Sequence, residues 1–126
     1  MISKIRERLR EKRRHKLHRE LGIAMTWNDL PMMEKIIFEN GIDPNEKYAA
    51  TRYERSFFQE AVMCGHIDTV KLMLKAGGDV FSPIFYGMRY YDLLEAASKP
   101  EIEQMIIQAR KDAKVVSKPL SPKKLG

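Results

Sequence analysis

Two short apolar patterns with helical spacing lie on either side of Gly65. In each, three apolar residues follow the i, i+3, i+4 spacing that places side chains on one face of a helix. These residues are Phe58, Ala61 and Val62 before the glycine, and Val70, Met73 and Leu74 after it. Gly77-Gly78-Asp79 ends the second pattern, because glycine takes the left-handed conformation that closes a helix without strain. Residues 56–81 therefore predict two short antiparallel helices.

The pattern recurs downstream and, more weakly, upstream. A shift of 33 places Tyr91 on Phe58, Leu94 on Ala61, and Ile106 and Ile107 on Met73 and Leu74. Upstream, residues 39–43 match residues 75–79 at a spacing of 36, although the helices before them need a one-residue gap to align. We expect Asp29 to cap the second helix of this first unit, with Pro31 just inside it. Pro100 is expected in the opening turn of the last helix.

The middle unit resembles the ankyrin repeat family, whose unit is a β-turn followed by two helices. Ala61, Gly65-His66, Val70–Leu74 and Gly77–Val80 look like the family pattern A-x-x-x-G-H, V-x-L-L-L and G-A-D-V. The chain departs from the family where Ser56-Phe57-Phe58-Gln59 stands in place of T-P-L-H. The family's threonine and histidine hydrogen bonds are therefore not carried over to this chain.

The resemblance implies an all-α, ankyrin-like helix-turn-helix repeat stack, an α-solenoid, because one helix pair cannot close a core alone. The expected repeats are residues 16–45, 52–81 and 87–113, which together make a repeat domain of residues 16–113. A basic helical arm, residues 1–15, precedes this domain. Residues 114–126 are expected to form a flexible basic tail, since they contain two prolines, two serines and four lysines. The alternative is an unrelated helical bundle, which would not require the recurrence.

Composition adds an uneven distribution of charge. Of the 126 residues, 44% are apolar and 32% charged, which favours a chain that folds in water. Residues 1–20 carry nine Lys or Arg against three Glu, and residues 110–126 carry six against one Asp. Residues 21–109 have a net charge of −5. The sequence therefore indicates an acidic body between two basic ends.

The start of the chain and the single cysteine bear on the compartment. The first residues are charged where a secretory signal needs an apolar stretch, and no apolar run of about 18 residues follows. Cys64 is the only cysteine, so the chain cannot form an internal disulfide. We expect an intracellular, cytoplasmic protein in a reducing compartment, or a nuclear one if the host is eukaryotic, with no membrane span.

The sequence contains no motif of the main enzyme classes. Gly-rich phosphate loops, the zinc-protease pattern H-E-x-x-H and the nucleophile elbow G-x-S-x-G do not occur. His15 and His18 have cationic neighbours that would repel a metal ion, and Cys64 is expected to be an inert, small apolar residue. Trp27 is expected to pack at the first helix–helix turn. We therefore expect no catalysis, no cofactor and no metal.

The turns after Asp43 and Asp79 are the best candidates for a binding surface. The resemblance implies that these turns project as fingers beside a concave face, and Tyr and Arg often anchor interfaces. The candidate partner-binding residues are Tyr48, Arg52, Tyr53, Arg55, Met63, Phe85, Tyr86, Met88, Arg89 and Tyr90. For any one of the aromatic residues, core packing is the competing interpretation. We expect an adaptor or inhibitor that binds another protein, such as a small regulator encoded by a virus or phage.

The basic arm supports two further hypotheses. It could bind nucleic-acid phosphate, an acidic partner or a lipid surface, or only keep the helix soluble. The residues in question are Arg6, Arg8, Arg10, Lys12, Arg13 and Arg14. The alternative function is thus a nucleic-acid-associated protein that grips phosphate through its basic ends, although no aromatic residue lies between the arginines. The third hypothesis is homo-oligomerisation through a broken apolar stripe, formed by Ile2, Ile5, Leu9, Leu17 and Leu21.

Overall fold

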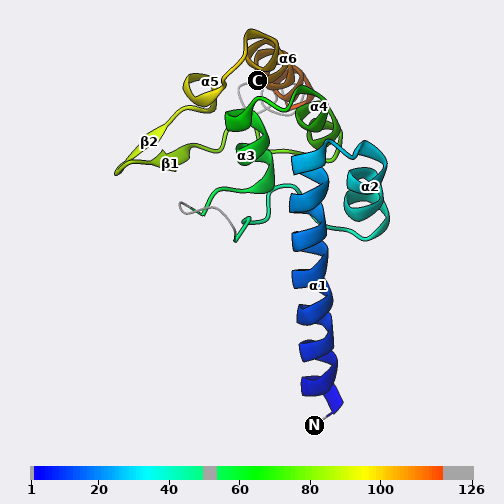
Figure 1. Cartoon of the computed structure of the whole chain (residues 1–126). Helices are drawn as coiled ribbons and strands as arrows, with labels where there is room; N and C mark the ends of the chain where they lie inside the picture. Colours follow the sequence, from blue (N-terminus) through cyan, green and yellow to red (C-terminus); the bar gives the residue numbers. More distant parts are fainter. Residues whose placement is uncertain (1, 50–53, 118–126) are drawn as a thin grey trace, which may run out of the picture.

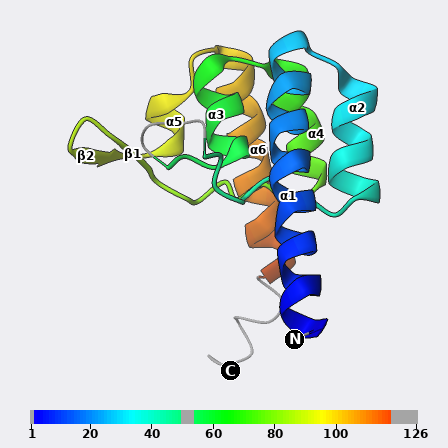
Figure 2. The same cartoon turned by 60° about the horizontal axis from the view of Figure 1, so that its bottom comes forward.

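The computed structural model describes residues 2–49 and 54–117, and this part of the chain is mostly helical. In chain order the elements are α1 (Ile2–Trp27), α2 (Leu30–Glu34), the π-helix η1 (Lys35–Glu39), α3 (Phe57–Cys64), α4 (Ile67–Lys75), β1 (Ile84–Tyr86), β2 (Arg89–Tyr91), α5 (Leu93–Ala96) and α6 (Pro100–Ser117). Successive helices pair, and the pairs pack side by side (Figures 1 and 2). Helix α4 contacts both α2 and α6, while α3 contacts α5.

The middle pair shows how the local sequence sets the helix ends. The Ser56 hydroxyl accepts a hydrogen bond from the Gln59 N–H, and the Gln59 side-chain oxygen accepts one from the Ser56 N–H, both at 3.0 Å. This reciprocal capping box satisfies two backbone donors at the start of α3. Gly65 ends the helix with a φ of 78°, a conformation that costs glycine little. The two helices expected within residues 56–81 are confirmed.

The second helix of the first pair, formed by α2 and η1, is one residue longer than α4, and a π-helix accommodates the difference. The Asp29 side chain caps α2, with Pro31 in the first turn, as the sequence predicts. Helices α2 and η1 each contain five residues, against nine in α4. In η1 the backbone hydrogen bonds span one residue more than in an α-helix, as from the Asn40 N–H to the Lys35 oxygen at 3.0 Å. The one-residue gap in the sequence alignment corresponds to this widened turn.

A β-hairpin precedes the third pair, and the all-α prediction missed it. Strands β1 and β2 are antiparallel, with Phe85 opposite Tyr90. Gly87 and Met88 form the two-residue turn with φ values of 56° and 77°. Tight hairpin turns of this kind need positive φ at both central positions. The signal was present in the sequence as aromatic residues of high β propensity on both sides of a glycine.

The first helix of the third pair, α5, is shorter than its counterpart α3. Asp92 caps α5, because Glu95 and Asp92 form the same reciprocal capping box as in α3. The caps Ser56 and Asp92 are 36 residues apart, whereas α4 and α6 begin 33 residues apart. The 33-residue alignment therefore holds for the second helix of each pair, where Met73 and Ile106 are both fully buried. For the first helix it is wrong by three residues, because α5 has four residues where α3 has eight, so α6 begins sooner after its partner helix than α4 does.

One hydrophobic core runs through the helix pairs. Its largest fully buried side chains include Leu21, Met33, Ile36, Phe57, Phe58, Met73, Ile84, Leu93, Ile102 and Ile106. Helix α1 contributes from Leu17 onward, and its first half projects beyond the body (Figure 1). Trp27 is 77% exposed, so the expectation that it packs at the first turn is wrong.

The predicted boundaries at both ends fall inside helices. Helix α1 passes through the expected limit of the arm at residues 15 and 16, and α6 continues past residue 113 to Ser117. Both stretches are rich in residues that favour helix, so the chain has no reason to break there. Residues 118–126 of the expected tail lie outside the described residues. None of the helices described here combines the length and the apolar character needed to cross a lipid bilayer.

The packing of α6 makes a first prediction. Ile106 is fully buried and its neighbour Ile107 only partly. Replacing Ile106→Ala leaves a cavity in the core, so the free energy of unfolding should fall by about 2–5 kcal/mol. Ile107→Ala is the matched control, with an expected loss of about 1 kcal/mol. Urea unfolding followed by circular dichroism measures both. Equal losses would contradict the assignment of Ile106 to the core.

Candidate functional site

Two segments project from the same side of the helix stack. We call residues 43–49 together with residues 54–56 the first finger and residues 79–92 the second finger; the second contains the β-hairpin (Figure 1). Each begins with an aspartate that accepts a hydrogen bond from the backbone N–H two residues later, at 2.9 Å: Asp43 from Asn45 and Asp79 from Phe81. Such turns fix the direction in which the chain leaves a helix. The 36-residue spacing predicted from the sequence is thus also the spacing of these two equivalent turns in the structure.

Asn45 ties the two fingers together at their bases. Its side-chain amide donates to the Gly77 oxygen at 2.9 Å, and its side-chain oxygen accepts from the Asp79 N–H at 2.8 Å. One carboxamide therefore satisfies a donor and an acceptor of the backbone where the next finger begins. This side chain sets the spacing between the two fingers.

A hollow of about 440 Å³ lies between the fingers. Its lining includes Asn45, Lys47 and Glu54 from the first finger and Ser82, Phe85 and Tyr90 from the second. Gln59, at the start of α3, forms the floor and is buried. Its side-chain amide donates to the Ser82 hydroxyl at 2.9 Å and to the Pro83 oxygen at 3.0 Å. The second finger is held on α3 by these two bonds.

Glu46 attaches the first finger to α1. One carboxylate oxygen lies 2.6 Å from the Arg14 guanidinium and 2.8 Å from His18 Nε2, and the other accepts from the Asp43 N–H at 2.9 Å. Burial raises the pKa of Glu46, but the hydrogen bonds from Asp43, His18 and Arg14 together hold that pKa below its ordinary value of 4.5. The ionised carboxylate is therefore the form that the folded chain stabilises.

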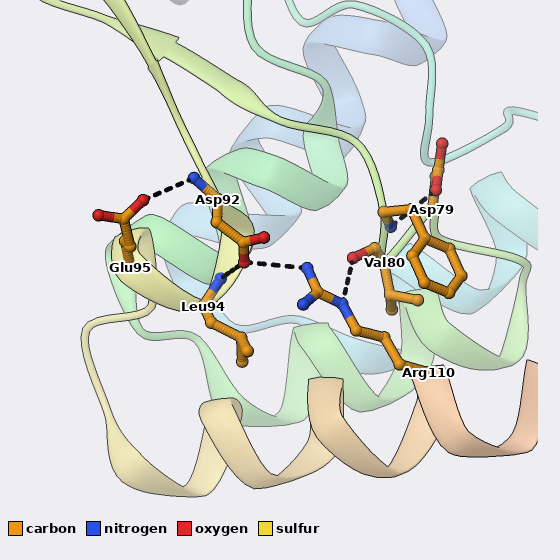
Figure 3. Close-up of polar contacts among 7 residues, drawn as sticks. Asp79, Val80, Asp92, Leu94, Glu95 and Arg110 are labelled. Carbon is orange, nitrogen blue, oxygen red and sulfur yellow. Dashed lines mark hydrogen bonds and ion pairs between the residues drawn. The ribbon is translucent and has the colours of Figure 1, made fainter.

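Arg110 on α6 holds both ends of the second finger (Figure 3). Its Nε donates to the Val80 oxygen at 2.9 Å and its Nη2 to Asp92 at 3.0 Å. Its guanidinium also lies 5.6 Å from the centre of the Phe81 ring. Hydrogen bonds from the Leu94 N–H and from Arg110 lower the pKa of Asp92, against a smaller effect of burial. The planar guanidinium thus closes the loop that carries the hairpin.

No sequence motif indicated Arg110. It lies four residues after Ile106, so its place on the buried face of α6 was the one available signal. The partners of its guanidinium come from the finger, 18 and 30 residues away in sequence. Sequence spacing alone does not reveal contacts of that range.

The tip of the second finger exposes apolar and aromatic side chains. Met88 is 89% exposed and Tyr90 is 67% exposed, and Tyr86 is also exposed. Phe85 packs against Tyr90 with ring centres 4.9 Å apart. The Arg89 guanidinium lies 4.0 Å from the centre of the Tyr91 ring. Five of the predicted partner-binding residues, 85, 86 and 88–90, therefore come together on one hairpin.

The first finger differs from the prediction. Tyr48 is half-buried and stacks on Phe57, with ring centres 4.7 Å apart, and burial raises the pKa of its hydroxyl. The Arg55 side chain is 14% exposed and lies 2.8 Å from Glu60. The expectation that Tyr48 and Arg55 form an exposed Tyr–Arg surface is thus wrong, because both side chains fasten the finger to the body. Arg52 and Tyr53 lie outside the described residues.

Met63 and part of the basic arm contact the body, whereas the rest of the arm is exposed. Met63 is half-buried against the core. Arg14 binds Glu46, and the Arg13 guanidinium donates to the Asn40 side chain at 3.4 Å. The remaining predicted arm residues are exposed along the projecting half of α1; they are Arg6, Arg8, Arg10 and Lys12.

Cys64 is exposed at the end of α3, and its thiol lies 3.2 Å from a Glu60 carboxylate oxygen. Burial of the sulfur, followed by the hydrogen bond and the negative charge of Glu60, raises the pKa of this thiol to about 11. The thiolate, which is the nucleophilic form, is therefore scarce at neutral pH. Within residues 2–49 and 54–117, no group of three or more His, Cys, Asp or Glu side chains is placed to hold a metal ion.

Comparisons with known proteins add no assignment to this geometry. No family model matches the chain, and neither a curated protein nor a solved structure matches it. The function has to be inferred from the fingers, the hollow between them and the exposed helix arm.

The contacts of Glu46 make stability depend on pH. Because the folded-state pKa is lowered, the stabilisation is complete above the unfolded-state pKa and is lost as pH falls through the folded-state pKa. Glu46→Gln should cost about 1–3 kcal/mol at neutral pH and reduce the loss of stability between about pH 6 and about pH 3. Urea unfolding across this range measures the difference. Glu7→Gln, on the exposed arm, is the matched control and should keep the wild-type pH profile. If Glu46→Gln also kept the wild-type profile, the role of Glu46 would be contradicted.

The raised pKa of Cys64 predicts slow alkylation. Two pKa units above the ordinary value correspond to about 100-fold less thiolate near pH 8, but a more basic thiolate is also more nucleophilic. Iodoacetamide should therefore react about tenfold more slowly than with the same chain unfolded in urea. Glu60→Gln removes the nearby charge and should speed the reaction. Mass spectrometry of timed samples gives the rates. A folded-state rate equal to the unfolded-state rate would refute the expected protection.

Proposed function

We propose that this chain is a non-enzymatic protein-interaction module of ankyrin-like architecture, acting as an adaptor or inhibitor. Paired helices that stack on their sequential neighbours support the ankyrin-like assignment, as does the left-handed Gly65 between α3 and α4. At the position of the family's T-P-L-H stand Ser56 and Gln59. The two residues cap α3, and Gln59 also binds the following finger, so side chains that form hydrogen bonds occupy this position.

The tip of the second finger carries this proposal. Met88 and Tyr90 expose large side chains on a hairpin whose two ends are held by Gln59 and Arg110. Aromatic residues are frequent among the few side chains that supply most of the binding energy at interfaces. A hairpin fixed before binding loses little conformational entropy when a partner arrives. The exposed tip is therefore suited to bury its aromatic surface against another protein.

The hollow beside the hairpin gives the partner a second place to bind. Its lining combines the aromatic rings of Phe85 and Tyr90 with charged side chains of both signs, Lys47 and Asp79 among them. The lining is mostly polar, and polar groups held in fixed positions can orient a partner through hydrogen bonds. We infer that a projecting loop of the partner enters this hollow while the hairpin tip covers its flank.

The exposed basic residues of α1 support the alternative, a nucleic-acid-associated protein. Arg6, Arg8, Arg10 and Lys12 are exposed on a helix that projects from the body. Binding that depends on phosphate contacts weakens steeply with salt, whereas burial of aromatic surface does not. The two functions can therefore be separated by salt and by variant.

An affinity capture from the host should distinguish the two. The wild type and an arm variant, Arg6→Gln with Arg10→Gln, should retain the same protein partner at about 0.5 M salt. Met88→Ala with Tyr90→Ala should weaken binding of the recovered partner at least about tenfold by calorimetry. Arg110→Met keeps the side chains of the tip but removes the hydrogen bonds to Val80 and Asp92 at the base of the finger. Its loss of affinity should therefore be smaller than that of the double variant. Capture of nuclease-sensitive material that depends on Arg6 and Arg10 would favour the alternative instead.

A further inference from the structure

The outer face of α1 carries apolar side chains that no described residue covers. Ile5, Leu9, Ile23 and Trp27, which we call the outer stripe, are exposed by 56%, 61%, 60% and 77%. Ile5 and Ile23 are 18 residues apart, as are Leu9 and Trp27, and that spacing is five full helical turns. The opposite face of the same helix buries Leu21 in the core. The helix is therefore apolar on two faces, and the stack uses one of them.

The outer stripe extends over both halves of α1. Beside its C-terminal half, Ile23, Trp27 and Met32 line a hollow of about 160 Å³ together with Glu20 and Asp29. The N-terminal half, with Ile5 and Leu9, projects away from the body (Figure 1). A helix segment of this length without tertiary contacts is marginally stable in water. Contact with another surface would stabilise the projecting half.

The spacing of the stripe is symmetric about Lys16. Ile5 and Trp27 are each 11 residues from Lys16, and Leu9 and Ile23 are each seven residues from it. All of them lie within about 40° of the direction in which Lys16 points. If two copies of α1 packed antiparallel about a twofold axis at Lys16, Ile5 would meet Trp27 of the second copy and Leu9 would meet its Ile23. A twofold interface is self-complementary in this way.

The charges favour the same orientation. In the antiparallel pair, residues 5–15 of one copy lie over residues 17–27 of the other; the first segment has a net charge of +4 and the second has none. A parallel pair would instead place the two +4 segments against each other. Lys12 would lie opposite Glu20 of the second copy, because each is four residues from Lys16. The two Lys16 side chains repel, and so do Arg13 and Arg19 of opposite copies, each three residues from Lys16. The long stems of these side chains can direct their charged groups into solvent.

We propose that the chain forms an antiparallel homodimer through the outer stripe of α1, with its twofold axis at Lys16. The contact is one helix per copy, so the dimer is weak, with a dissociation constant of about 1–100 µM. The arm then acts as a dimerisation element, and each basic segment is placed beside the body of the second copy. Both second fingers remain free, because they project from other elements than the outer face of α1.

Sedimentation equilibrium over about 5–500 µM tests the association. The wild type should shift from monomer to dimer, whereas Ile5→Glu with Leu9→Glu should remain monomeric and keep its helical circular dichroism spectrum. Arg6→Gln with Arg10→Gln changes the charge by the same amount off the stripe and should still dimerise. Lys16→Leu removes the repulsion at the axis and should tighten the dimer about tenfold or more. A wild type that is monomeric throughout overturns the proposal.

Disulfide trapping tests the axis itself, in a Cys64→Ser background. Lys16→Cys should form a covalent dimer with its own copy, because residue 16 faces residue 16 across the axis. Lys12→Cys should not, since its own copies are offset by eight residues, about 12 Å, which exceeds the reach of a disulfide. A mixture of Lys12→Cys and Glu20→Cys should cross-link to each other. Equal trapping at all positions, or a monomer that binds anionic vesicles or DNA through Ile5 and Leu9, overturns the proposal.

Discussion

Every short helix in this fold leaves backbone donors and acceptors unsatisfied at its ends, and the structure depends on side chains that satisfy them. Ser56 and Gln59 do so at the start of α3, and Asp92 and Glu95 at the start of α5. Asn45 extends the same principle between units, since its carboxamide serves a donor and an acceptor of the following finger. The helices can therefore be short, and the chain between them can project without losing its direction.

These polar contacts also explain why the two fingers differ. The first finger is fastened along its length, by Glu46 to α1 and by Tyr48 to Phe57. The second finger is fastened only at its base, by Gln59 and Arg110, and its strands carry the remaining surface outward. Tyr48 in the first finger thus stabilises the body, while Tyr86 and Tyr90 in the second are exposed. The same residue types in equivalent loops have opposite roles because their neighbours differ.

The sequence predicted those features that depend on a few adjacent residues. The cap at Asp29, the left-handed Gly77 and the position of Pro100 all follow from local backbone chemistry, and each is found. The prediction from helical spacing missed the hairpin at Gly87, because its local signal was a strand pattern on both sides of a glycine. The role of Arg110 could not be predicted, because its partners lie 18 and 30 residues away. Trp27 is likewise exposed because no described segment distant in sequence packs over it, and no local pattern predicts such a contact.

The π-helix η1 has a consequence for how such a chain can change over generations. Its extra residue is accommodated within five positions, and Ile36 and Ile37 remain buried at its centre. An insertion in a packed helix would ordinarily rotate every later side chain by about 100°. Here the wider turn takes up that rotation before Asp43, so the finger and all later units keep their register. Length variation between homologous chains would therefore be tolerated at this turn, whereas α3, held at its start by the Ser56–Gln59 capping box, has no comparable place to absorb it.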